Sequence, residues 1–89
     1  MDDFRLKVFI TAARTLSFTR TAERLYISQP AVSRHIGELE SRYRVPLFVR
    51  RGSRLELTAA GQVLLQLFIV PLAVEQEGSA FLQVRRHIE

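Results

Sequence analysis

Two short segments with helical spacing of apolar residues stand close together in this chain, and the short gap between them constrains the fold most strongly. The first covers about residues 18–25 and the second about residues 29–43. Ser17 and Ser28 directly precede them, and serine is a favoured N-cap because its hydroxyl accepts a hydrogen bond from a backbone N–H of the first turn. Two short helices joined by a turn of three or four residues predict a helix-turn-helix.

The second of these segments separates apolar from polar positions. Val32, Ile36, Leu39 and Tyr43 form a stripe at helical spacing that is expected to face inward. Pro30 lies in the first turn, where its missing N–H costs little. The remaining positions near the N-terminal end are small, uncharged or basic. Such an end suits a helix that enters the major groove of DNA.

The charge of the chain is unevenly distributed. The whole chain has 13 Lys and Arg residues against 9 Asp and Glu, for a net charge of +4. Residues 1–54 carry a net charge of +6, whereas residues 55–89 carry −2. A basic half favours a polyanion as partner. The alternative to a DNA-binding domain is a domain of this type that binds only proteins, and the basic half argues against that alternative.

One more helix is predicted before this pair of segments, and a hairpin after it. Apolar spacing predicts the first helix over residues 4–14. Two strands, over residues 48–50 and 55–57, are expected to flank a basic tip at residues 51–54. Gly52 permits a positive φ in that tip. A hairpin in this place is the wing of a winged helix.

Thr58 is a candidate N-cap for a fourth, long helix with two apolar faces. One face, which includes Leu64 and Phe68, is expected to pack on its own domain. The other has the 4-3 spacing of a coiled-coil seam and predicts pairing with a second copy. Its apolar members are Val63, Leu67, Val70, Val74, Phe81, Val84 and Ile88. Because a proline removes a backbone donor and clashes with the preceding turn, Pro71 predicts a kink near residues 67–71 or a break.

The chain resembles the LysR-type transcriptional regulators in three ordered segments, LSFTRTAERLYISQPAVSRHIGELE, VPLFVRR and LTAAG. The resemblance implies a mainly α fold, with a winged helix-turn-helix of three helices and a two-stranded wing in residues 1–57. A linker and dimerisation helix follows in residues 58–89. The implied function is sequence-specific binding of double-stranded DNA by a cytoplasmic regulator that acts as a homodimer, with a tetramer also compatible with full-length members.

A larger C-terminal domain of such regulators binds a small-molecule inducer. That domain is not part of these 89 residues, so an inducer is expected only for it.

Candidate DNA-binding residues lie on three of the predicted elements. The start of the 18–25 helix offers hydroxyls and backbone N–H groups to a phosphate. The start of the 29–43 helix offers Gln and Arg, which pair with adenine and guanine, and apolar groups that touch thymine methyls. The wing offers arginines to the backbone or the minor groove. The candidates are Ser17, Phe18, Thr19, Ser28, Gln29, Pro30, Ala31, Ser33, Arg34, Arg50, Arg51 and Arg54.

Several of these assignments have a simpler alternative. Ser17 and Ser28 also serve as plain helix caps. Arg34 can contact either a base edge or a phosphate, and a phosphate contact carries no sequence information. Arg20 and Arg24 are left open, because either can pair with neighbouring acids instead of DNA.

Other classes of site find no support. The chain has no cysteine, and His35 and His87 lie about fifty residues apart, which is not a metal-ligand spacing. The sequence shows no glycine-rich phosphate loop, nucleophile elbow or triad. We therefore predict no enzyme, metal or cofactor. The longest apolar stretch spans about twelve residues, short of the ~20 of a membrane helix, so no membrane is expected as partner.

The chain departs from the usual LysR pattern in four places. They are Tyr43-Arg44 in place of Leu-Gly, Ala59 in place of Pro, His35 in place of Gln, and Pro71 in the linker helix. Because Arg44 replaces a residue suited to left-handed φ, the turn before Pro46 is expected to differ. His35 is expected at the surface or near the DNA.

Overall fold

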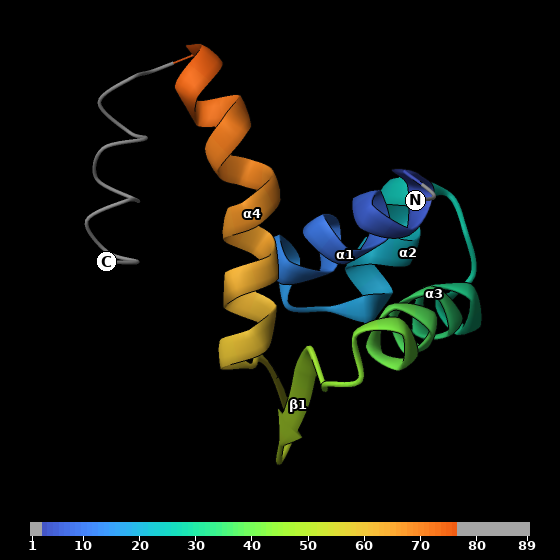
Figure 1. Ribbon diagram of the computed structural model, residues 1–89. Coiled ribbons are helices and arrows are strands. Elements are labelled where there is room, and N and C mark those ends of the chain that lie inside the picture. Colours follow the sequence, from blue (N-terminus) through green and yellow to red (C-terminus); the bar gives the residue numbers. More distant parts are fainter. Residues whose placement is uncertain (1–2, 77–89) are drawn as a thin grey trace.

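The computed structural model describes residues 3–76, with side chains described for residues 4–68. The described part is mainly helical with one two-stranded antiparallel sheet, as predicted. In chain order its elements are α1 (Asp3–Thr15), α2 (Phe18–Leu25), α3 (Gln29–Tyr43), β1 (Phe48–Arg51), β2 (Arg54–Leu57) and α4 (Ala59–Gln76). α1, α2 and α3 pack together, α4 runs along one side of them, and the wing formed by β1 and β2 projects at the base of α4 (Figure 1).

Capping serines set the starts of α2 and α3, whose bounds match the prediction. Ser17 Oγ accepts a hydrogen bond from Arg20 N at 3.1 Å, and Ser28 Oγ accepts one from Ala31 N at 3.2 Å. α2 ends at Tyr26, which takes the left-handed conformation with φ 57°. This sharp stop leaves only a short turn, so α3 must cross α2 closely.

The hydrophobic core lies where α1, α2, α3, the wing and α4 meet. The buried apolar side chains are Val8, Phe9, Ala12, Ala22, Val32, Ile36, Leu39, Leu47, Phe48, Leu55 and Leu64. The rings of Phe9 and Phe48 lie 5.7 Å apart, so the first helix and the first strand share one aromatic contact. The wing is therefore held to the helices by its own buried side chains.

Two polar side chains fix the wing to α3 and α4. Glu40 Oε2 accepts hydrogen bonds from Leu47 N at 2.8 Å and Phe48 N at 3.4 Å. Thr58 Oγ1 donates to Pro46 O at 2.7 Å and accepts from Gly61 N at 3.0 Å. Thr58 therefore caps α4, as predicted, and also ties the helix start to the segment that leads into β1.

Gly61 is required by packing at this junction. A Cβ at this position would lie 2.5 Å from Leu47 O and 2.6 Å from Leu57 Cδ1. Both distances are shorter than non-bonded contact allows, and one partner is backbone. The first turn of α4 therefore packs directly on the wing.

The tip of the wing is shorter than predicted. Arg51 and Arg54 belong to the strands and pair with each other, which leaves only Gly52 and Ser53 in the turn. Gly52 has φ 62°, and a two-residue loop with glycine first is typical of a type II′ turn. The prediction of a four-residue tip was wrong, because two residues are enough to reverse the chain here.

Pro71 does not break α4. The helix is continuous from Ala59 to Gln76, so a break at this proline, one of the two predicted outcomes, is wrong. A proline removes one hydrogen bond, while the turns on either side of it keep theirs. A kink near residues 67–71 stays a prediction.

Two of the departures from the LysR pattern have a clear structural outcome. Arg44 ends α3 with φ 59° and ψ 35°, so the left-handed turn is kept although no glycine is present. His35 is half-buried rather than fully at the surface: its side chain is 15% exposed and its ring packs edge-on against Phe4 at 5.3 Å. It faces α1 because it flanks the buried stripe of α3.

Candidate nucleic-acid interface

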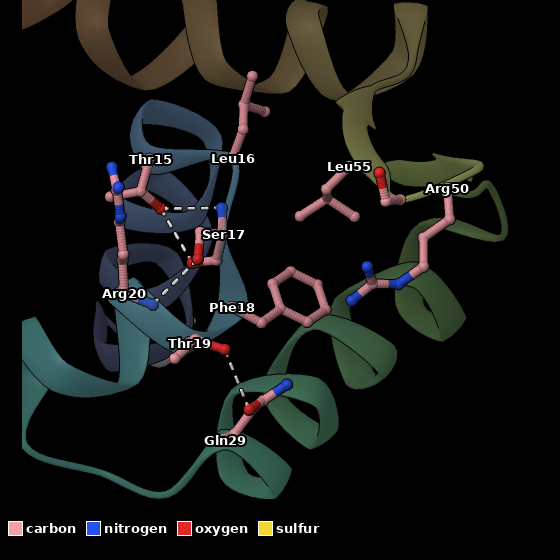
Figure 2. A pocket seen from close by; sticks show the side chains of 10 residues that line it. Thr15, Leu16, Ser17, Phe18, Thr19, Arg20, Gln29, Arg50 and Leu55 are labelled. Atoms are coloured by element: carbon pink, nitrogen blue, oxygen red, sulfur yellow. Dashed lines mark hydrogen bonds between the residues drawn. The ribbon is translucent and has the colours of Figure 1, made fainter.

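A polar hollow of about 360 Å³ opens at the N-terminal end of α2. The end of α1, the link to α2, α2 itself, α3 and the wing line it together, with the residues Thr15, Leu16, Ser17, Phe18, Thr19, Arg20, Gln29, Arg50, Ser53 and Leu55. We call it the α2 hollow (Figure 2). Five of the predicted DNA-binding residues thus meet at one place, although they come from three separate elements.

The start of α2 combines cap and hydrogen-bond donors. Ser17 Oγ is occupied by the capping bond from Arg20 N, and its hydroxyl hydrogen is left to donate elsewhere. The N–H groups of Phe18 and Thr19 belong to the first turn, where no carbonyl of the same helix can accept from them. A helix start of this kind presents donors and the positive end of the helix dipole to an anion.

Gln29 is oriented by a contact with α2. Thr19 Oγ1 donates to Gln29 Oε1 at 3.2 Å, which ties the first residue of α3 to the start of α2 (Figure 2). The amide oxygen keeps a second lone pair and the amide nitrogen keeps its two hydrogens. The side chain thus retains the donor and acceptor that a bidentate contact to adenine requires.

Arg50 is held over the ring of Phe18. Its guanidinium carbon lies 6.0 Å from the ring centroid, at the outer limit of a cation–π contact. Phe18 in turn packs edge-on against Phe48, with centroids 5.6 Å apart. Figure 2 shows the Arg50 guanidinium beside the Phe18 ring, and both residues line the α2 hollow. The Phe18 side chain therefore supports an arginine rather than standing free in solvent.

The other two wing arginines have different surroundings. Arg51 Nε lies 2.8 Å from Glu56 Oε1, in an exposed ion pair. Arg51 also stands directly opposite Arg54 in the register of the two strands. Like charges in opposed positions destabilise a hairpin slightly, and a bound anion relieves that repulsion. Arg50 is thus the one wing arginine that lines the α2 hollow.

The outward side of α3 carries the remaining candidates. Pro30, Ser33 and Arg34 are exposed, and Ala31 is half-buried. Ser33 also lines a second hollow of about 190 Å³, which it shares with Arg50 and other residues of α2, α3 and the wing. The outward side of α3 and the wing therefore meet at this second hollow.

Comparison with known protein families gives a match over more than half of the chain. Residues 4–62 match the bacterial regulatory helix-turn-helix protein, lysR family. The chain belongs to the LysR family.

Relatives and solved structures place the LysR-family domain among transcriptional regulators. It is 42% identical over 84 residues to the Hca operon transcriptional activator HcaR of Escherichia coli strain K12, a match that covers 94% of this chain and 28% of that protein. The chain thus spans less than a third of that relative. A crystal structure of a LysR-family regulator from Eggerthella lenta is 55% identical, with a TM-score of 0.70 over 72% of this chain and 91% of that one.

Several similar structures contain DNA. The complex of the BenM DNA-binding domain with catB site 1 DNA has a TM-score of 0.75 at 30% identity, over 96% of this chain and 97% of that one. The described residues thus form a DNA-binding domain of the LysR type. Among the described residues, no helix is long and apolar enough to cross a membrane.

The α4 helix of the LysR-family domain exposes apolar side chains on one face. Val63 is 58% exposed and Leu67 is 64% exposed. Together with Tyr43, Val45 and others they line a strongly apolar hollow of about 160 Å³ between α4 and the end of α3. These are the first two positions of the predicted seam.

The rest of the predicted seam is not tested. Val70 and Val74 fall within α4, but their side chains are not described. Phe81, Val84 and Ile88 lie outside the described residues.

Sequence reasoning missed parts of the α2 hollow. Ser53 and Thr15 line it and were not candidates, and Arg20 had been left open. Ser53 lies 36 positions after Ser17, and only the fold of the wing brings it near α2. For Arg20 a signal existed, because a basic side chain in the first turn of a helix lies near the donors that the helix start offers to an anion.

Proposed function

We propose that this LysR-family domain binds a specific sequence of double-stranded DNA, with the N-terminal half of α3 in the major groove. The observation that carries the proposal is the α2 hollow, where the start of α2, Gln29 and Arg50 meet beside the outward side of α3. A polar hollow with a helix start on one wall and an arginine on another suits a phosphate oxygen. The DNA complex of the similar BenM domain supports the same partner.

The proposal distinguishes contacts to phosphates from contacts to base edges. The N–H groups of Phe18 and Thr19 and the guanidinium of Arg50 hold a phosphate, which fixes the register of the domain on the duplex. Ser33 and Arg34 reach base edges in the groove. Gln29 does the same, with its orientation set by Thr19. Phosphate contacts supply most of the affinity, and base contacts supply the sequence preference.

The second element of the proposal is a homodimer. Residues 1–57 bind DNA, and residues 58–89 pair two copies so that their α3 helices address two half-sites. The exposed Val63 and Leu67 support this pairing, because adjacent apolar side chains on a helix face lower their free energy when a partner covers them. In the bacterial cytoplasm, a full-length regulator would add a C-terminal domain for a small-molecule inducer.

Binding to duplex DNA at several salt concentrations tests the first element. The affinity should fall with salt with a log–log slope of about −0.9 for each phosphate neutralised. Binding sequences selected from a random DNA pool should then share a half-site repeated with dyad symmetry. Absent or salt-insensitive binding would favour a module that binds protein instead.

Arg34→Ala tests the division between base and phosphate contacts. If Arg34 reads a base, the variant should lose about 1–3 kcal/mol on the selected duplex and less on a random one. Arg42→Ala is a matched control, because Arg42 is exposed in the last turn of the same helix. An equal loss on both duplexes would reassign Arg34 to a phosphate.

A further inference from the structure

Gly37 stands in the interior of α3 and nothing in the fold explains it. It is the ninth of the fifteen residues of this helix. Apart from proline, glycine is the least favourable residue in a helix interior, because its backbone loses the most conformational freedom on folding. A glycine in this place therefore needs a reason.

The other glycines of the described residues each have such a reason. Gly52 has the positive φ of the wing turn, and Gly61 packs against Leu47 O, where a Cβ would lie 2.5 Å away. At Gly37, by contrast, an added Cβ would meet no described atom within 4 Å beyond its own helix backbone. The fold therefore has room for a Cβ at this position.

Gly37 lies on the outward side of α3. Val32, Ile36 and Leu39 are buried on the opposite side. Residues three and four apart are neighbours on a helix surface, so Gly37 adjoins Arg34, Ser33 and the exposed Ser41. Ser33 opens into the hollow that α3 shares with Arg50 of the wing. Gly37 thus continues the surface on which the candidate DNA contacts lie.

We propose that Gly37 sets how deeply α3 enters the major groove. Without a side chain at this position, base edges on the floor of the groove approach the helix backbone more closely than any other residue allows. The inference rests on the proposed function, because it assumes that this side of α3 faces the duplex. Gly37 is then a positioning residue for specificity, and it makes no hydrogen bond to DNA through a side chain.

Stability and affinity should respond in opposite directions to Gly37→Ala. Because alanine is the better helix former and the added methyl meets open space, the melting temperature should rise by about 4–8 °C. Binding to the selected duplex should weaken by about 5- to 150-fold, the range produced by losing the contacts of one base pair. Binding to a random duplex should stay within about 3-fold, because it depends on phosphate contacts.

Two further variants sharpen the experiment. Gly37→Gln should weaken specific binding more than Gly37→Ala does, because the longer side chain holds the helix further from the bases. Ser41→Gln adds a similar side chain one turn nearer the end of α3, and it should weaken specific binding less than Gly37→Gln.

Three results would overturn the inference. The first is that Gly37→Ala binds the selected duplex as tightly as the wild type or more tightly. The second is that Gly37→Ala loses equal affinity for the selected and the random duplex. The third is that Ser41→Gln loses as much affinity for the selected duplex as Gly37→Gln does. If the wild-type chain binds DNA in a salt-dependent way and any of these occurs, only this inference fails. If the wild-type chain binds no duplex, the proposed function fails with it.

Discussion

The two ends of this domain expose different chemistry. At one end, α3 and the wing expose Arg34, Arg50, Arg51 and Arg54. At the other, α4 exposes Val63 and Leu67, and it contains a single charged residue, Glu75. The C-terminal part of this helix extends beyond the other described helices (Figure 1). Water solvates exposed charges well, but it solvates exposed valine and leucine poorly. The basic end thus favours a polyanion and the apolar end favours an apolar partner, so salt should weaken the first association and leave the second nearly unchanged.

Leu67→Glu places a charge on the exposed apolar face of α4, and it should have the largest effect. A charge in a buried seam is strongly unfavourable, so the chain should become monomeric. Loss of the second, linked half-site should weaken binding to a two-half-site duplex by about 10²- to 10⁴-fold. Light scattering and titration of the duplex measure the two results.

The control is Gln62→Glu, which adds the same charge to α4 at an exposed position off the predicted seam. It should leave both mass and affinity unchanged. A dimer that persists in Leu67→Glu would remove Leu67 from the seam.

Arg50→Ala tests the basic end. Since the guanidinium lines the α2 hollow, its loss should weaken binding to specific and random duplexes alike by about 1.5–3 kcal/mol, as for a charge-assisted hydrogen bond. The salt slope should become shallower by about 0.9. Arg51→Ala is the matched comparison and should have a smaller effect, because Arg51 is already paired with Glu56. A larger loss for Arg51 would place the phosphate at the wing tip instead.

Gly61→Ala tests the junction between the two ends. The new Cβ would lie 2.5 Å from a backbone oxygen of the segment that leads into the wing. Because α4 and the wing must separate to make room, we expect a loss of about 1–3 kcal/mol in the free energy of unfolding, measured with urea. A neutral or stabilising outcome would mean that α4 moves freely against the wing.

The helices were predictable because their signals are local. Serine caps and apolar stripes set the bounds of α2 and α3 correctly, and Thr58 marked the start of α4. The prediction of a break at Pro71 was wrong because it rested on the properties of proline alone. A rule for one residue cannot weigh the hydrogen bonds of the whole helix around it.

The candidate site was predictable only as a set of elements. The sequence indicated Phe18 and Arg50, which are 32 positions apart, but it could not show that one supports the other. Nor could it separate Arg50 from Arg51, because adjacent strand residues point to opposite faces and the partner of each depends on the fold. His35 faces α1 for a similar reason, since the first helix covers that flank of α3.

Arg44→Gly should have the smallest effect and marks the boundary between the two ends. Arg44 is exposed and left-handed, with φ 59°. Glycine removes a steric penalty of about 1–2 kcal/mol but loosens the unfolded chain by about 0.4–1 kcal/mol, so a net gain of about 1 kcal/mol in the free energy of unfolding is expected. Arg44→Ala loses the same charge but keeps the penalty, so an equal gain there would exclude the backbone as the cause. Because Arg44 follows Tyr43 beside the apolar hollow, neither variant should change DNA affinity as Arg50→Ala does. A loss as large as that of Arg50→Ala would extend the basic end to the C-terminus of α3 and overturn the division between the two ends.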